Sequence, residues 1–127
     1  MIVIPLTWDR PPLRANDRRT WQAQHRARAK AMTEARAAIA AAKPGRYVGA
    51  VVTLHYRVPD RRRRDSDGPE PTKKVCIDAL VLEGVLPDDS WVEVPRSSVE
   101  MHAPNGEPAA MWLELTEVHR YDEDGAA

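Results

Sequence analysis

The segment from Arg61 to Asp89 constrains the fold of this chain more than any other part of its sequence. It begins with four consecutive arginines that run directly into Asp65-Ser66-Asp67, and it ends with Asp88-Asp89. The apolar stretch between the two acidic groups is long enough for one helix and ends at Gly84, a residue suited to a helix C-terminus. Unpaired like charges repel one another and are costly to desolvate, so this segment is expected to meet ions of opposite charge.

The flanking segments predict an α/β domain of the α+β type. Residues 20–42 are rich in alanine and lack Gly and Pro, which favours a long helix with Thr20 as its N-cap and Lys43-Pro44-Gly45 as its end. Alternating or β-rich patterns predict strands at residues 2–6, 47–58, 91–101 and 111–118, with a hairpin turn at residues 104–107 joining the last two. We therefore expect a small mixed sheet of about four strands and two main helices. We expect residues 1–118 to form the single domain and residues 119–127 to form an acidic, frayed tail.

Helical spacing predicts which side chains of the two helices are buried. In the long helix the expected stripe runs from Trp21 through Arg28 to Ala42, and His25 is expected to be partly buried on it. The second helix, from about Thr72 to Glu83, is expected to bury Val75, Cys76, Ala79, Leu80 and Leu82. Ile77 and Val81 lie outside that set, which predicts that this helix or a neighbouring strand also contributes to a subunit interface.

The net charge conceals a strong polarity along the chain. The formal net charge is zero, but residues 1–64 hold 15 Lys/Arg against 4 Asp/Glu, whereas residues 65–127 hold 4 Lys/Arg against 15 Asp/Glu. Such asymmetry suggests a polyanion partner for the basic half, and the alternative is that the two halves neutralise each other in the fold. The lone Cys76 excludes an internal disulfide. The chain lacks a long apolar run and a signal-peptide pattern, so a cytoplasmic protein is expected.

The carboxylates suggest a site for a hard cation. Asp65 and Asp67 leave a predicted strand, and Asp88-Asp89 leave the following helix, so strand, loop, helix and loop can bring the acids to one end of the sheet. Mg²⁺ needs only one or two carboxylates and otherwise keeps water or phosphate oxygens. Lys74, with Lys73 as the second choice, could stabilise charge on a phosphate. Each motif also has a structural interpretation: Asp-x-Asp is common in turns, and Lys74 can pair with Asp78 along its helix.

Basic side chains near these acids are candidates for contacts with phosphates. An irregular loop at residues 9–20 and the arginine run supply most of them. Individually each is also an ordinary surface residue. The predicted DNA-binding set is Arg14, Arg18, Arg19, Arg61, Arg62, Arg63, Arg64 and Lys73.

The central motif resembles the RusA-type Holliday junction resolvases, small endodeoxyribonucleases of bacteria and their phages and prophages. The matching residues are Pro59 to Asp67, Lys74, Asp78-Ala79-Leu80, Gly84 and Asp88-Asp89, and a weaker likeness extends over nearly the whole chain. The resemblance implies a homodimer that binds four-way DNA junctions and, with Mg²⁺ or with Mn²⁺ in its place, nicks two opposed strands in recombination and repair. It further implies that Asp65, Asp67 and Asp89 bind the metal as catalytic aspartates and that Lys74 is the catalytic lysine.

One departure from the family pattern leaves alternatives open. The family usually has Asn after its second aspartate, where this chain has Gly68, and the connection through Thr72 is longer than in the shortest members. Glu70 could be an additional ligand. The alternatives are a nuclease for other branched DNA, such as flaps and forks, and a junction-binding protein with a degenerate active site.

Overall fold

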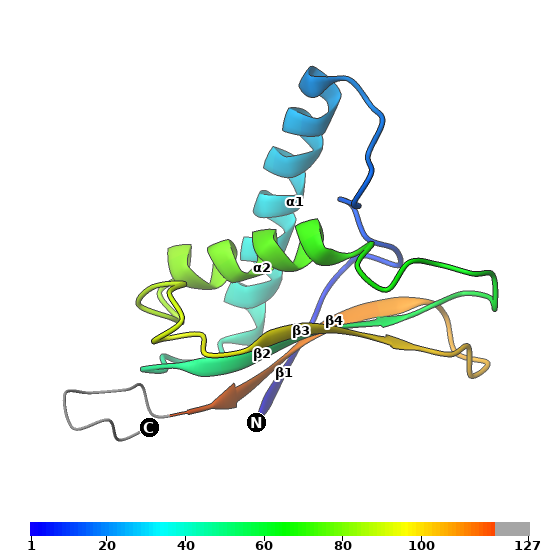
Figure 1. The fold of residues 1–127 in the computed structure, drawn as a ribbon. Coiled ribbons are helices and arrows are strands. Elements are labelled where there is room, and N and C mark those ends of the chain that lie inside the picture. The colour runs from blue at the N-terminus through cyan, green and yellow to red at the C-terminus, as the bar shows by residue number, and fades with distance from the viewer. Residues whose placement is uncertain (119–127) are drawn as a thin grey trace.

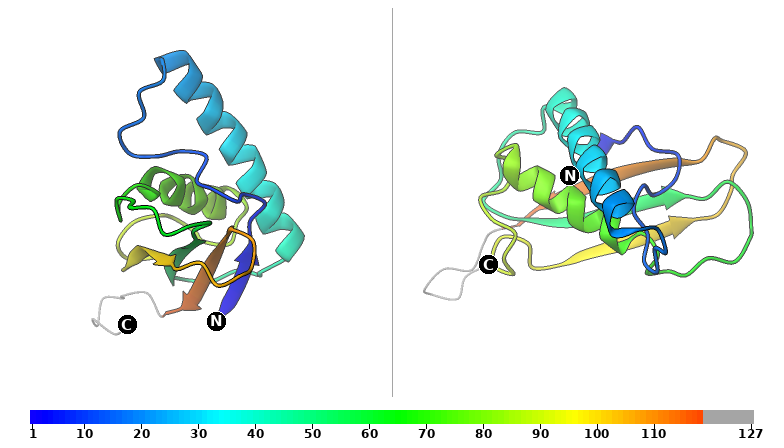
Figure 2. Two further views of the ribbon diagram at one scale, coloured as in Figure 1. Left: turned by 90° about the vertical axis from the view of Figure 1, so that its right-hand side faces the viewer. Right: turned by 90° about the horizontal axis from the view of Figure 1, so that it is seen from above.

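The computed structural model describes residues 1–118 and has two layers, a four-stranded sheet and two helices that cover one of its faces (Figures 1 and 2). The predicted α+β architecture is confirmed at this level. The predicted tail, residues 119–127, lies outside the described residues. In chain order the elements are β1 (Ile2–Pro5), α1 (Trp21–Ala42), β2 (Ala50–Arg57), α2 (Glu70–Leu82), β3 (Ser97–His102) and β4 (Ala110–Glu117).

The sheet is mixed, with the strand order β1-β4-β2-β3. Strand β3 runs parallel to β2, with His55 opposite Glu100, and α2 forms the crossover between these two strands. Strand β4 lies between β1 and β2 and is antiparallel to both. The predicted hairpin of the last two strands is therefore wrong, because β2 separates β3 from β4. The Pro104–Glu107 segment instead carries the chain past the end of β2.

The core fills the space between the sheet and the helices. Strands β2 and β4 alternate, so that every second side chain points toward the helices and is buried. Cys76 of α2 is fully buried among them, and burial raises the pKa of its thiol to about 12. This agrees with the prediction of a structural cysteine. The fully buried residues of this layer include Ile4, Ala31, Ala35, Ile39, Val52, Leu54, Val75, Leu80, Leu113 and Leu115.

Helix α1 begins and ends where the sequence predicts. The hydroxyl of Thr20 accepts a hydrogen bond from the Ala23 amide, and Lys43 ends the helix in the left-handed conformation. The predicted burial of its first turns is wrong: Trp21 is 72% exposed, and His25 is exposed and stacks on it at 5.2 Å. The reason is visible in Figure 1, where the N-terminal half of α1 extends away from the sheet and has no layer to pack against.

Helix α2 begins two residues before the predicted start and ends before Gly84, whose φ of 77° favours glycine. The burial of two of its side chains is the reverse of the prediction. Leu82 is 56% exposed, whereas Ile77 is buried. Val81 also packs partly against the core. The apolar surface that suggested a subunit interface on α2 is thus largely used within the subunit.

The segment Trp91–Val94 is a turn, not the predicted start of a strand. Its alternating pattern is overridden by local hydrogen bonds from Ser90, whose hydroxyl oxygen accepts from the Val92 amide and whose carbonyl accepts from the Val94 amide. The Ser90 hydroxyl also donates to the Glu93 carboxylate. The turn then packs against Gly49, where the Glu93 carbonyl oxygen lies so close that an added Cβ would approach it to 2.9 Å.

Within residues 1–118, neither helix combines the length and apolar character that a membrane crossing requires.

Candidate metal centre and phosphate-binding surface

Lys74 connects the two acidic parts of the central segment. It lies on the second turn of α2, and its Nζ donates to Asp78 Oδ1 at 2.9 Å and to Asp89 Oδ2 at 3.0 Å. Asp78 also faces Arg28 of α1, whose Nη2 lies 3.6 Å from Asp78 Oδ2. The structure therefore contains both the intrahelical pair and a contact that brings the Asp88-Asp89 loop back to the N-terminal half of α2.

A surface hollow of about 320 Å³ forms around this contact. It collects four residues that the sequence singles out, two lysines and two acids. Lys73, also in this hollow, pairs with Glu70, with its Nζ 2.8 Å from Glu70 Oε2. The lining residues are Glu70, Lys73, Lys74, Ile77, Asp89, Val94 and Ser97.

Asp65 and Asp67 lie in the turn that leads directly into α2. Backbone hydrogen bonds shape this turn, from the Gly68 amide to the Asp65 carbonyl at 3.1 Å and from the Glu70 amide to the Asp67 carbonyl at 3.1 Å. Both side chains are exposed, and within the described part of the chain no hydrogen bond or ion pair holds either carboxylate. The two carboxylates are thus free to accept a ligand, and the positive end of the α2 dipole stabilises their negative charge.

The basic loop at residues 9–20 is fastened to this acidic turn. The Ala15 amide donates to the Gly68 carbonyl at 2.9 Å. The hydroxyl of buried Thr72 accepts from the Leu13 amide at 3.1 Å and donates to the Leu13 carbonyl at 2.6 Å. Exposed Arg14 is therefore held between two anchors beside the Asp65–Gly68 turn. Sequence reasoning missed this role of Thr72, because a threonine near a helix start usually indicates a cap.

The predicted phosphate-binding residues divide into free and engaged groups. Arg64 folds back on its own loop, donating to the Asp60 carboxylate and carbonyl, and its side chain is only 19% exposed. Hydrogen bonds from the Arg62 amide and the Arg64 side chain lower the pKa of Asp60. Arg19 is likewise paired with Asp17, and this hydrogen bonding lowers the Asp17 pKa to about 2. The exposed side chains that these pairs leave open are those of Arg14, Arg18, Arg61 and Arg63. The Arg62 side chain is also largely open, because its Nε lies 3.8 Å from Asp60 Oδ1.

The ion pair at the centre of the hollow changes the pKa values of both partners. The hydrogen bond from Lys74, followed by its positive charge, lowers the pKa of Asp89 below 3.8, and hydrogen bonds from Asp78 and Asp89 raise the pKa of Lys74 above 10.5. The stabilisation from Asp89 is therefore present above pH 3.8 and is lost as pH falls through its lowered pKa. The stabilisation from Lys74 is present below pH 10.5 and is lost as pH rises through its raised pKa. At neutral pH Lys74 is a cation and Asp89 an anion.

We expect the Asp89 carboxyl to titrate below its ordinary value of 3.8 in the wild-type chain and to move back toward that value in Lys74→Met, because methionine keeps the aliphatic volume but removes the donor. Carbon-detected NMR titration of the aspartate carboxyls measures both midpoints. Lys30→Met, which changes an exposed lysine of α1, is the matched control and should leave Asp89 unchanged. Identical Asp89 midpoints in wild type and Lys74→Met would contradict the contact.

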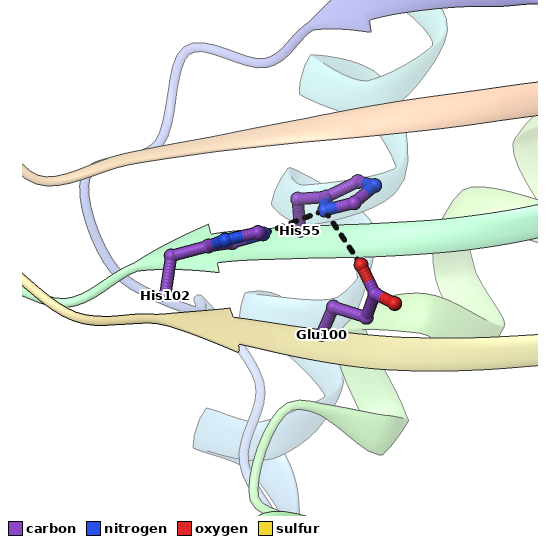
Figure 3. Close-up of side chains that lie close together, drawn as sticks. All are labelled: His55, Glu100 and His102. Carbon is purple, nitrogen blue, oxygen red and sulfur yellow. Dashed lines mark hydrogen bonds and ion pairs between the residues drawn. The ribbon is translucent and has the colours of Figure 1, made fainter.

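A second group of side chains, of types that commonly bind metals, lies on the face of the sheet opposite the helices. His55 of β2, with Glu100 and His102 of β3, offers three ligand atoms within 4.8 Å of one another (Figure 3). This group could hold a metal ion. It is the only such cluster of three His, Cys, Asp or Glu residues among the described residues, so Asp65, Asp67 and Asp89 are not drawn together as closely. Sequence reasoning missed it, because only the strand pairing of β2 with β3 places His55 beside the Glu100-x-His102 pattern.

Comparison with known proteins adds no relative. Neither a scan of protein-family models nor a search of curated proteins finds a match to this chain.

Proposed function

We propose that this protein is a Mg²⁺-dependent endodeoxyribonuclease that resolves four-way DNA junctions by paired nicks, acting as a homodimer. The observation that carries the proposal is the contact between Lys74 and Asp89 in a hollow at the amino half of α2, the helix that directly follows the Asp65–Asp67 turn. These four side chains come from separate parts of the sequence motif. Lys74 and Asp89 are in contact, and the Asp65–Asp67 turn precedes the same helix, which supports a phosphodiester-cleaving site around its amino half.

The donor set fits a hard divalent cation. Asp65, Asp67 and Asp89 are exposed carboxylates, and oxygen ligands of this kind suit Mg²⁺ or Mn²⁺. The three aspartates would hold the ion, with Asp65 and Asp67 contributed by the turn before α2 and Asp89 by the hollow, where Glu70 is a further oxygen donor. When bound, the ion supplies positive charge for an in-line displacement at phosphorus and makes hydroxide available at neutral pH.

The protein side chains have separate tasks around a bound phosphodiester. Lys74, kept protonated by Asp78 and Asp89, is a fixed cation that can donate to a phosphate oxygen and stabilise its developing charge. Arg14, held beside the acidic turn, and the exposed arginines at 61–63 can neutralise neighbouring phosphates. Arg64 has a different task, because its bonds to Asp60 shape the loop that leads to Asp65.

Asp67→Asn is expected to retain junction binding and to abolish Mg²⁺-dependent cleavage, because it removes a ligand charge without changing the size of the side chain. The measurement is a gel assay of a labelled mobile four-way junction, with binding assayed in Ca²⁺ and cleavage in Mg²⁺. Asp9→Asn, another exposed loop aspartate, is the matched control and should cleave normally. Cleavage by Asp67→Asn at the wild-type rate would refute the assignment of this residue.

A substrate panel separates the proposal from its alternatives. Paired symmetric nicks in four-way junctions, with slower cutting of forks, flaps and duplex, support junction resolution. Faster cutting of forks or flaps indicates a nuclease for other branched DNA. Salt-sensitive junction binding without any cut indicates a degenerate site. Light scattering should give a dimer, because two equivalent strands require two equivalent sites. A monomer at micromolar concentration would contradict the paired mechanism.

A further inference from the structure

The face of the sheet opposite the helices carries a cluster that the proposed nuclease does not use. Side chains of β3 alternate, so Val99 and Met101 pack toward the core while Glu100 and His102 point to the other face. His55 of β2 is directly opposite Glu100 in the parallel register. Figure 3 shows the imidazole of His55 between the side chains of His102 and Glu100.

Hydrogen-bond chemistry determines which ring nitrogen of His55 presents a lone pair to this cluster. The Nε2 of His55 lies 2.8 Å from Glu114 Oε1, and a carboxylate can only accept, so the proton of neutral His55 belongs on Nε2. The Nδ1 of His55 is then an acceptor. It accepts a hydrogen bond from the Nε2–H of His102 at 2.7 Å and lies 3.4 Å from Glu100 Oε2. A cation that replaces the shared proton would be bound by lone pairs of all three atoms.

The surroundings orient these rings as a metal site requires. Glu114 receives the outer N–H of His55, the arrangement in which a carboxylate fixes the tautomer of a metal-binding histidine. Trp112 stacks on both imidazoles, with centroids 5.2 Å from His55 and 5.3 Å from His102. His55 is buried with its side chain 7% exposed, whereas Glu100 is 59% exposed and leaves a path for the ion and for water.

The donor set and its dimensions select the class of ion. Two imidazoles and one carboxylate suit Zn²⁺, Co²⁺ or Ni²⁺ and not Mg²⁺, and three protein ligands with an open fourth position are usual for zinc. Tetrahedral ligands at zinc bond lengths are about 3.4 Å apart. The separation of His55 Nδ1 from Glu100 Oε2 already matches this at 3.4 Å. The two nitrogens, at 2.7 Å, need to separate by about 0.7 Å.

We infer that His55, Glu100 and His102 form a binding site for a divalent transition metal of the zinc class, with Glu114 orienting His55. The ion bridges β2 to the edge strand β3 on the uncovered face of the sheet. This site is separate from the oxygen-ligand site beside α2, because the two lie on opposite faces of the sheet.

The test is metal binding by the full chain without DNA. Metal-free protein is titrated with Zn²⁺ by calorimetry and with Co²⁺ by visible absorption, in the presence of excess Mg²⁺. We expect one ion per chain and the intense absorption of four-coordinate Co²⁺. His102→Ala and Glu100→Gln should weaken Zn²⁺ binding by about 100-fold or more, and Glu114→Gln by about 10- to 100-fold.

Two control variants make the result specific. His25→Ala removes an exposed histidine of α1, and Asp89→Asn removes a carboxylate of the other site, and both should bind Zn²⁺ like wild type. Glu100→Gln changes an exposed side chain, so its fold is expected to survive even if His102→Ala is unstable. Absent Zn²⁺ binding, equal affinity in wild type and Glu100→Gln, or loss of binding in Asp89→Asn alone would overturn the inference. Because no DNA is present, these outcomes do not depend on nuclease activity.

Discussion

Asp89→Asn is expected to lower the rate of Mg²⁺-dependent junction cleavage by about 10²- to 10³-fold, the range found when one group that stabilises transition-state charge is removed. Asparagine retains the shape of the side chain but lacks its charge. The substitution therefore weakens the oxygen-ligand site and also releases Lys74 from one of its two carboxylate partners. Single-turnover cleavage of a labelled junction at saturating enzyme measures the rate without a contribution from binding.

The matched control for Asp89→Asn is Glu83→Gln. It also removes an exposed ion pair, in which Glu83 Oε2 accepts from Arg36 Nε at 2.6 Å. Glu83 is the C-cap of α2 and lies at the end of the helix opposite to the proposed site. Thermal unfolding should be nearly unchanged in both variants, since exposed ion pairs contribute little to stability. If Asp89→Asn cleaves at a rate within a few-fold of Glu83→Gln, Asp89 is not part of the reacting centre.

Thr72→Val is expected to lower the free energy of unfolding by about 1–3 kcal/mol, because it leaves the buried amide and carbonyl of Leu13 without their hydrogen-bond partner. Valine has nearly the volume of threonine, so the change reports the lost hydroxyl and not a cavity. Urea unfolding gives this value as a lower midpoint with an unchanged dependence on urea concentration.

Thr33→Val on α1 is the control for Thr72→Val. Its hydroxyl also donates to a backbone carbonyl, that of Ala29, at 3.2 Å, but on an exposed surface. The two substitutions share the same change in helix propensity, so Thr33→Val should alter stability by no more than about 0.5 kcal/mol. Equal losses in the two variants would show that the bonds to Leu13 do not fasten the basic loop.

Local sequence signals predict where the helices begin and end better than they predict which elements pack together. The boundaries of α1 follow from Thr20 and Lys43, and Gly84 marks the end of α2, because caps and stops are properties of neighbouring residues. The exposure of Trp21 and the turn at Trp91 could not be predicted in this way. The first depends on a layer that is absent opposite the helix end. The second depends on hydrogen bonds of Ser90 that compete with the alternating pattern and on the bond from the distant Ala50 amide to the Glu93 carbonyl.

The same limit applies to the candidate site. The spacing of Lys74 and Asp78 on one helix predicts their contact. The order of the elements predicts that the acidic loops meet at one end of the sheet, and from the second loop Asp89 reaches Lys74 of α2. The docking of Leu13 on Thr72 and the approach of His55 to His102 join residues far apart in the sequence. The approach of His55 to His102 depends on the pairing of β2 with β3, and the alternating pattern of a single strand does not reveal which strand lies beside it.

The buried thiol of Cys76 can report how often α2 separates from the sheet. The side chain is inaccessible between α2 and the sheet, and its raised pKa keeps it protonated, so a thiol reagent meets a reactive thiolate only after α2 has separated from the strands. The rate of labelling therefore measures how often α2, the helix that carries Lys74, separates from the sheet. Since Cys76 is the only cysteine in the chain, every labelled molecule records the same event.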